Sequence, residues 1–383
     1  MSRDSNMMNV PAPARERIDW IDIAKGVSIL LITFLHVVLL SDAAGLALWR
    51  LKWINSFLAA IRLPLFFTVA GVFAGKSLRS PWRVLLRNKV LLYAWLIVIW
   101  NLVFWFSFST LVTQPQWVGK TIEVTAAFRS MLLPLSPIWF LQALALFFIA
   151  GKLLAAVPRT LGLAFAVAMS LATLGVLAKR YDIVHLVPGG RGYSKALIYF
   201  AFFYAGAMFP AVVLKAGNLH FRWAVLLLLG CLGLQASLAL LDNPALNAMI
   251  QLASSCSGVA ALLIGSRVIA PTVPGRLFRY IGRRTLAIYV AQYPIIAGLA
   301  WLLIGLGVEQ SRLLSYAGVL VCTFATIVLT LLLQRILQMI GLASFYRLPR
   351  WTGAGRNAPP AVPGDRPPAA IRETGAGRCR RRS

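Results

Sequence analysis

Long apolar runs, separated by short polar or basic stretches, make up most of the chain. A helix that crosses a membrane needs about 20 mostly apolar residues, and ten runs approach that length. They lie near 22–40, 53–75, 90–112, 138–156, 161–178, 196–214, 223–241, 247–269, 285–306 and 313–337. The pattern predicts an all-α, polytopic integral membrane protein with about ten transmembrane helices.

The composition narrows the function classes. Hydrophobic residues make up 59% of the 383 residues and charged residues only 13%, whereas soluble globular proteins carry about 25% charged residues. The net charge of +27 would fit a nucleic-acid partner, but the basic residues lie between the apolar runs. We therefore expect a lipid bilayer as partner and no nucleic acid. The four cysteines occur singly, and the sequence predicts no metal site.

The Lys and Arg residues predict the orientation, because cytoplasmic loops carry the excess of basic residues. With a cytoplasmic N-terminus, 28 of the 38 basic residues fall in inner segments and nine in outer loops. Both termini are therefore predicted to be cytoplasmic, and the chain to be integral to the cell (inner) membrane. We expect a cytoplasmic segment over 1–17 and a membrane domain over 18–346. The shift to Pro, Gly, Ala and Arg predicts a disordered basic tail over 347–383.

Ionisable groups inside a membrane helix point to function, and the first predicted helix contains several. Asp19, Asp22 and Lys25 follow one another at three-residue spacing and form a charged cytoplasmic entrance near one helix face. His36 lies on the same stripe as Lys25, eleven residues or about 16 Å further along the axis. Two interpretations of His36 remain open: a general base, or a packing histidine that hydrogen-bonds a neighbouring helix.

The second predicted helix places Arg62 near the middle of the membrane. A guanidinium there cannot reach water simply by extending its side chain. We therefore expect Arg62 to line a polar cavity and to contact an anionic or carbonyl-bearing group. The alternative is that Arg62 is a buried partner of Asp19 or Asp22.

A group of basic residues follows the second helix and comprises Lys76, Arg79, Arg83, Arg87 and Lys89. The excess that cytoplasmic loops carry explains them without any ligand. The functional interpretation is that they bind the phosphates of a cytosolic anionic cofactor, together with Lys25, Arg283 and Arg284.

Four segments resemble one known family. They are RIDWIDIAKGVSILLITFLH in the first helix, RLPLFFTVAG in the second, PIWFLQALALFF opening the fourth, and IGRRTLAIYVAQYPII leading into the ninth. With them the chain resembles the membrane-bound acyltransferase 3 family, whose members transfer acetyl or succinyl groups to extracytoplasmic sugars and related hydroxyls. The resemblance extends from about residue 17 to 340.

The resemblance implies about ten helices, acyl-coenzyme A (acyl-CoA) supplied from the cytoplasm, and His36 as the catalytic centre. Lys25 stands where the family more often has arginine, and Gln292 where many members have a second histidine. Arg62 or Gln292 would then stabilise the oxyanion, and the acyl-CoA would bind near Asp19, Lys25, Arg83, Arg87, Arg283 and Arg284. Direct transfer and an acyl-histidine intermediate both remain possible.

The sequence therefore predicts an acyl-CoA-dependent O-acyltransferase, with acetyl as the expected group and an exported glycan as acceptor. A transporter or flippase of an anionic or glycan substrate is the alternative, and a non-catalytic membrane subunit is a third class. Two outer loops, near 113–137 and 179–195, carry Trp117, Tyr181 and Tyr193. These aromatic residues fit sugar stacking and interfacial anchoring equally well.

Overall fold

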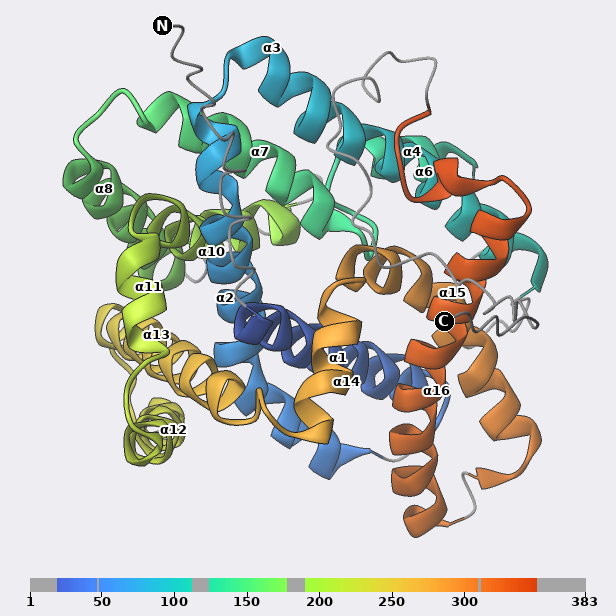
Figure 1. The fold of residues 1–383 in the computed structure, drawn as a ribbon. Coiled ribbons are helices and arrows are strands. Elements are labelled where there is room, and N and C mark those ends of the chain that lie inside the picture. The colour runs from blue at the N-terminus through green and yellow to red at the C-terminus, as the bar shows by residue number, and fades with distance from the viewer. Residues whose placement is uncertain (1–18, 47, 112–123, 178–189, 309–310, 350–383) are drawn as a thin grey trace, which may run out of the picture. The chain divides into compact units, whose positions relative to one another are not determined.

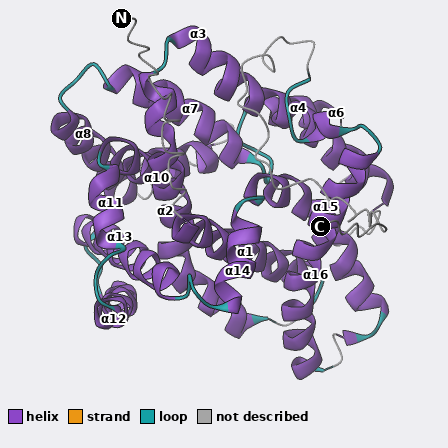
Figure 2. Cartoon of the chain, in the orientation of Figure 1, coloured by secondary structure: helices purple, strands orange, loops and turns teal. Residues whose placement is uncertain are grey.

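The computed structural model describes residues 19–46, 48–111, 124–177, 190–308 and 311–349. The chain divides into two units, Met1–Arg347 and Leu348–Ser383. Most of the second unit, and with it the predicted tail, lies outside the described residues, as do the predicted segment 1–17 and the loop aromatics Trp117 and Tyr181. Within the described residues the secondary structure is helical and contains no strand (Figure 2), so the predicted all-α class is confirmed there.

The first unit contains the helices shown in Figure 1. The α-helices are α1 (Asp19–Ala43), α2 (Trp49–Arg79), α3 (Trp82–Leu85), α4 (Leu91–Phe106), α6 (Val124–Leu132), α7 (Trp139–Leu154), α8 (Arg159–Ala172), α10 (Gly190–Met208), α11 (Pro210–Ala216), α12 (Phe221–Ser237), α13 (Pro244–Val268), α14 (Val273–Gly282), α15 (Thr285–Gly305) and α16 (Arg312–Met339). Shorter segments are the π-helical η1 (Leu86–Val90), η2 (Ser107–Leu111) and η3 (Thr173–Leu177), and the 3₁₀ turns η4 (Leu238–Leu240) and η6 (Ala343–Phe345).

Each of the ten predicted spans falls on helix, but fewer helices are long enough to cross a membrane. Among the described residues seven helices are long and apolar enough, or eight if α10 and α11 form one broken span. The shorter apolar helices are Trp139–Leu154 and Arg159–Gly175. Length and composition therefore support a multi-pass arrangement, and the count of ten stays a prediction.

The break between α10 and α11 has a local cause. The two helices meet at an angle of 92°, and Pro210 begins α11. Proline lacks a backbone N–H and disfavours helical geometry at the preceding residue. Phe209 accordingly leaves the helical region, with φ −125° and ψ 48°. An apolar run of adequate length thus becomes two helices.

Closely packed glycines hold α1 to its neighbour α14. A Cβ atom on Gly26 of α1 would collide with the backbone carbonyl of Phe278 in α14, and one on Gly282 would collide with the carbonyl of Asp22 in α1. Small residues let membrane helices approach until their backbones touch, where dispersion contacts and weak polar contacts are strongest. The pair of glycines fixes α14 against the N-terminal end of α1, beside its acidic first turn.

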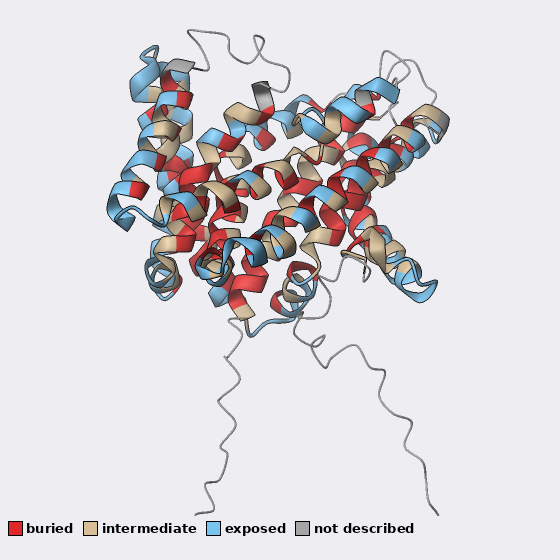
Figure 3. Cartoon of the chain, turned by 90° about the horizontal axis from the view of Figure 1, so that it is seen from above, coloured by how far each residue is buried: buried red, intermediate tan, exposed pale blue. Residues whose placement is uncertain are grey.

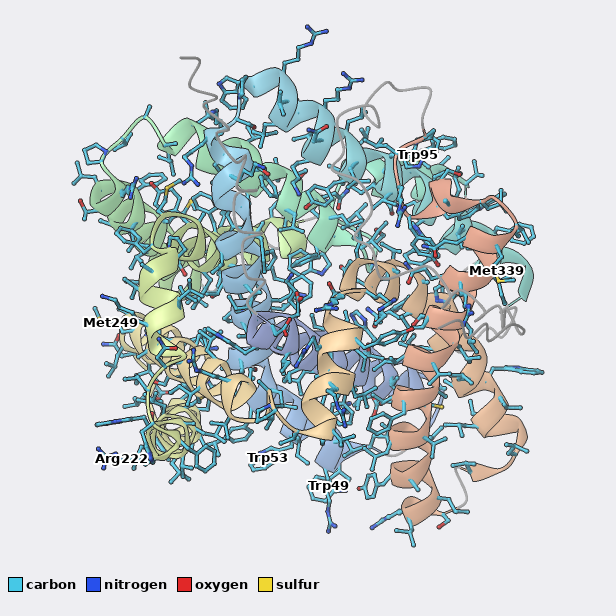
Figure 4. The ribbon with its side chains drawn as sticks, viewed as in Figure 1. Trp49, Trp53, Trp95, Arg222, Met249 and Met339 are labelled. Carbon is cyan, nitrogen blue, oxygen red and sulfur yellow. The ribbon has the colours of Figure 1, made fainter. Side chains whose placement is uncertain are left out.

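Burial is concentrated in the middle of the helical assembly (Figure 3). The core includes Phe67, Phe203 and Tyr204, all fully buried, while outward surfaces carry large apolar side chains. Trp49 and Trp53, at the start of α2, are 61% and 63% exposed and point away from the other helices (Figure 4). Exposed tryptophans at a helix end are typical of a membrane–water interface.

Candidate active site

His36 lies in α1, two turns before the helix ends at Ala43. Its ring packs edge-on against the ring of Tyr293 in α15, with centroids 5.7 Å apart and planes at 81°. The Nδ1 atom is buried and has no hydrogen-bond partner among the described residues. The aromatic contact therefore orients the imidazole and leaves Nδ1 able to bind a ligand.

Gln292 precedes Tyr293 in α15 and is only 1% exposed. Thr33, one turn before His36, donates its hydroxyl to Gln292 Oε1 at 2.8 Å. The Gln292 amide nitrogen, Nε2, is buried and has no partner in the described part of the chain. Since Thr33 holds the oxygen, the nitrogen remains an oriented hydrogen-bond donor.

Arg62 lies in the middle of α2 and is 7% exposed. Its Nη1 atom donates to the backbone oxygen of Asn55 at 2.9 Å and to Asn55 Oδ1 at 2.7 Å. Helical side chains lean toward the helix N-terminus, which explains why the guanidinium reaches a residue two turns earlier. Arg62 Nε and Asn55 Nδ2 are buried without a partner among the described residues.

A hydrogen bond sets the register of α1 against α2. Ser28 donates its hydroxyl to the backbone oxygen of Arg62 at 2.7 Å. From that point His36 lies eight residues further along α1 and Asn55 seven residues back along α2, shifts of roughly 12 and 10 Å in this antiparallel hairpin. The guanidinium, which bonds Asn55, therefore lies near the depth of His36, and the two groups interact electrostatically.

The three predicted catalytic residues share one property with a few other buried polar groups of the described chain. His36 Nδ1, Arg62 Nε and Gln292 Nε2 are all buried nitrogen atoms without a partner in the described chain. A buried polar atom left unpaired costs roughly 1–3 kcal/mol, so such atoms are uncommon and call for an explanation. One site with a proton acceptor and two donors could bind a carbonyl and an adjacent hydroxyl.

The charged end of α1 is held by ion pairs to α14 and to the residue after it. Asp19 pairs with Arg279 at 2.7 Å and with Arg283 at 3.1 Å, and Asp22 pairs with Arg283 at 3.4 Å and with Lys25 at 3.2 Å. We call these five residues the entrance network. The Arg62 guanidinium bonds Asn55 instead of either acid, so the alternative that Arg62 is a buried partner of Asp19 or Asp22 is wrong.

The other predicted cofactor-binding residues are distributed more widely. The Arg284 guanidinium stacks on the ring of Tyr280, 3.9 Å from its centroid. Arg83 is exposed on α3 and Arg87 half-buried on η1, and α3 stands apart from α1 and α14 (Figure 1). The structure therefore joins Asp19, Lys25 and Arg283 in one network, with Arg83 and Arg87 on a separate element.

The comparison with known protein families decides the class of protein. A family model described as an acyltransferase domain matches residues 18–333, which is most of the chain. The chain belongs to the membrane acyltransferase 3 family. Its apolar helices and this domain together describe a multi-pass membrane acyltransferase. The searches of curated proteins and of solved structures find no match.

The sequence analysis did not identify several residues that the structure places at the candidate site. Asn55 stands seven positions before Arg62, on the same helix face, and that spacing was the available signal. Tyr293 and Thr33 gave none, because their partners are chosen by how α1 packs against α15. Arg279 stands four residues before Arg283, and this spacing on one helix face was a readable sign of a shared partner.

Proposed function

We propose that this acyltransferase moves an acyl group, most simply acetyl, from cytoplasmic acyl-CoA to a hydroxyl of an extracytoplasmic glycan, with His36 as general base. The observation that carries the proposal is the set of unpartnered buried atoms His36 Nδ1, Arg62 Nε and Gln292 Nε2. A general base and two preorganised donors are what acyl transfer through a tetrahedral oxyanion requires. The transporter alternative does not account for the acyltransferase domain.

The acyl donor would approach from the end of the molecule that carries the entrance network. Lys25 lies at its inner edge, with its ammonium 3.7 Å from the centroid of the Phe73 ring. The phosphates of acyl-CoA would bind Arg283 and Arg284 at this end, and Arg83 and Arg87 would add positive charge from the separate segment formed by α3 and η1. The pantetheine arm would follow α1 from Lys25 toward His36, about 16 Å along the helix axis.

The transfer reaction itself would use three side chains, those of His36, Arg62 and Gln292. His36 takes the proton of the acceptor hydroxyl while the acceptor oxygen attacks the thioester carbonyl carbon and forms a new C–O bond. Arg62 and Gln292 donate to the carbonyl oxygen as it becomes an oxyanion. The oxyanion collapses, the C–S bond breaks, and the departing thiolate takes the proton from the imidazolium. The products are the glycan ester and free coenzyme A.

A test in cells compares the ester-linked acyl groups on surface and exported glycans, released by mild alkali and measured by mass spectrometry. Cells lacking the chain receive the wild-type protein or the His36→Ala or His220→Ala variant. His220 is an exposed residue that caps the N-terminus of α12, so it provides a matched histidine control.

We expect wild type and His220→Ala to restore the acyl groups and His36→Ala not to do so. Normal acylation with His36→Ala at equal protein levels would remove His36 from the chemistry. Unchanged acylation in cells that lack the chain would contradict the proposed glycan acceptor.

A further inference from the structure

A pocket of about 350 Å³ lies between α2, α10 and α13. Along α2 its lining residue Ala59 precedes Arg62, whereas Phe73, which contacts Lys25 of the entrance network, follows Arg62. Its lining includes Ala59, Tyr199, Phe202, Asn247, Gln251 and Ser255. Its volume falls within the range of small-molecule sites, about 300–1,000 Å³. Nothing in the donor path described above uses this pocket.

The polar side of the pocket comes from one face of α13. Asn247, Gln251 and Ser255 follow one another at four-residue spacing and therefore form a stripe along the helix. Met249, on the opposite face, is 59% exposed and points outward (Figure 4). Polar residues in a membrane helix normally face the interior of the bundle or a cavity, and here they face α10.

The polar groups in this stripe retain unused hydrogen-bonding capacity. Asn247 donates Nδ2 to the backbone oxygen of Leu241 at 2.9 Å, but its Oδ1 atom is buried and has no partner among the described residues. Gln251 accepts a bond from Gln235 at 3.1 Å through its oxygen, which leaves its amide nitrogen as a donor. The Ser255 hydroxyl adds a group that can donate and accept hydrogen bonds, on a residue that is 4% exposed.

The opposite wall is aromatic. The Tyr199 ring lies almost parallel to the ring of Phe67, with centroids 5.6 Å apart, and Phe202 adds a second aromatic surface to the pocket. None of the lining residues is an acid, a lysine, an arginine or a histidine. The chemistry therefore suits a neutral ligand with several hydroxyls and an apolar face, and not the phosphates of acyl-CoA or a bare acyl chain.

The pocket also adjoins the catalytic residues. Ala59 is one turn before Arg62 in α2, and Tyr199, which also lines the pocket, packs against Phe67, five residues after Arg62 in the same helix. The Arg62 guanidinium in turn lies near the depth of His36. We propose that this acceptor pocket binds one neutral sugar residue of the acceptor and directs its hydroxyl toward Arg62 and His36, an inference that rests on the proposed acyl transfer.

A second pocket, of about 280 Å³, serves as the competing location. It is lined by Tyr193, together with Trp139 and mainly apolar residues. The sequence placed Tyr193 in an outer loop, but it lies in the first turn of α10. Its polar side chains are fewer. Gln142 donates through Nε2 to backbone oxygens of Ser130 and Leu133 at the end of α6, and its Oε1 is the one buried side-chain atom of this pocket without a partner among the described residues. Tyr193 alone is therefore weaker evidence for a sugar site in the second pocket than the polar stripe of α13 is for one in the first.

The kinetic test uses purified full-length protein in nanodiscs, labelled acetyl-CoA, and carbohydrate released from the producing cells as acceptor. Ser255→Leu should narrow the pocket and raise the KM for acceptor by about tenfold or more, with the KM for acetyl-CoA unchanged. Ser255→Ala, which only removes the hydroxyl, should raise it about fivefold. Cys256→Leu is the matched control, because Cys256 is the next residue of α13 but exposed.

An unchanged acceptor KM in both Ser255 variants, or a rise in the acetyl-CoA KM instead, would overturn the pocket assignment while leaving the proposed function intact. If the wild-type protein transfers no acetyl group, or if His36→Ala transfers it at the wild-type rate, the proposed function is overturned. The pocket is then decided by photolabelling with methyl glycosides of glucose, galactose, mannose and rhamnose that carry a diazirine. Labelling of α10 and α13 peptides that Ser255→Leu reduces supports the pocket, and labelling at Tyr193 and Trp139 contradicts it.

Discussion

At the scale of single residues, Arg62 has one guanidinium nitrogen held by hydrogen bonds and another that is available to donate. Asn55 accepts two hydrogen bonds from Nη1, at 2.9 and 2.7 Å, while Nε has no partner among the described residues. A guanidinium held in this way presents its second donor at a set position, which a lysine ammonium on a flexible stem does not. The geometry of the donor, and not only its charge, is therefore expected to matter for acyl transfer.

Arg62→Lys tests this directly. The variant keeps the charge and should fold, but it should lower kcat by at least about tenfold because the fixed donor to the oxyanion is lost. The measurement is the rate of acetyl transfer by purified variant protein at matched amounts, with the melting temperature as a check on folding. A rate near that of the wild type would assign Arg62 a structural role.

Residue types were more predictable than residue partners. His36, Arg62 and Gln292 stand out in the sequence because ionisable or amide groups within apolar runs are costly. Their environment depends on contacts between helices far apart in the sequence, such as Thr33 with Gln292 and His36 with Tyr293. No spacing within one helix reports such contacts, so the sequence could name the candidate catalytic residues but not the side chains that orient them.

At the scale of helices, the contact between α1 and α14 depends on two glycines. Gly282→Ala would place a methyl group against the backbone carbonyl of Asp22, which cannot move without shifting α1. We expect a loss of about 2–3 kcal/mol in stability, measured as a lower melting temperature in detergent. Gly298→Ala, in α15 with open space around it, should be neutral or slightly stabilising because alanine favours helix.

Equal melting temperatures for the two variants would mean that α14 does not pack on α1 at this glycine. The comparison is informative because both substitutions add the same single methyl group. Only the surroundings of the two positions differ.

The entrance network gives a second prediction at this scale. Asp22 is 1% exposed and contacts both Arg283 and Lys25, so Asp22→Asn leaves partly buried cations without their carboxylate and should cost about 2 kcal/mol. The control is Asp42→Asn, whose pair with Lys52 is 2.9 Å long but solvent-exposed, and whose loss should cost about 0.5 kcal/mol or less. Chemical denaturation followed by tryptophan fluorescence measures both. A similar cost for the two would contradict a stabilising network.

The positions at which helices end or break could not be predicted from the apolar pattern of the sequence alone. The run 196–214 has the length of a span, yet Pro210 divides it into two helices at 92°. The segments near 138–156 and 161–178 form helices too short to meet the length of a span. Apolar composition predicts that a segment is buried in membrane or protein, but the packing of neighbouring helices decides how it crosses.

At the scale of the whole first unit, the site lies between two chemically different approaches. One is the entrance network with its charged groups, where we propose that the anionic acyl-CoA enters. The other is the acceptor pocket, lined by neutral polar and aromatic residues. Arg62, His36 and Gln292 come from α2, α1 and α15, so the proposed site forms only when these three helices pack correctly. This arrangement explains why the acyltransferase domain spans most of the chain.

The most direct test of the account is the initial rate of transfer from labelled acetyl-CoA to released glycans by purified full-length protein in nanodiscs. The account predicts that His36→Ala lowers this rate by about 100-fold or more, at an unchanged melting temperature, while His220→Ala transfers at the wild-type rate. A folded His36→Ala protein that keeps its activity within about tenfold of wild type would contradict the account.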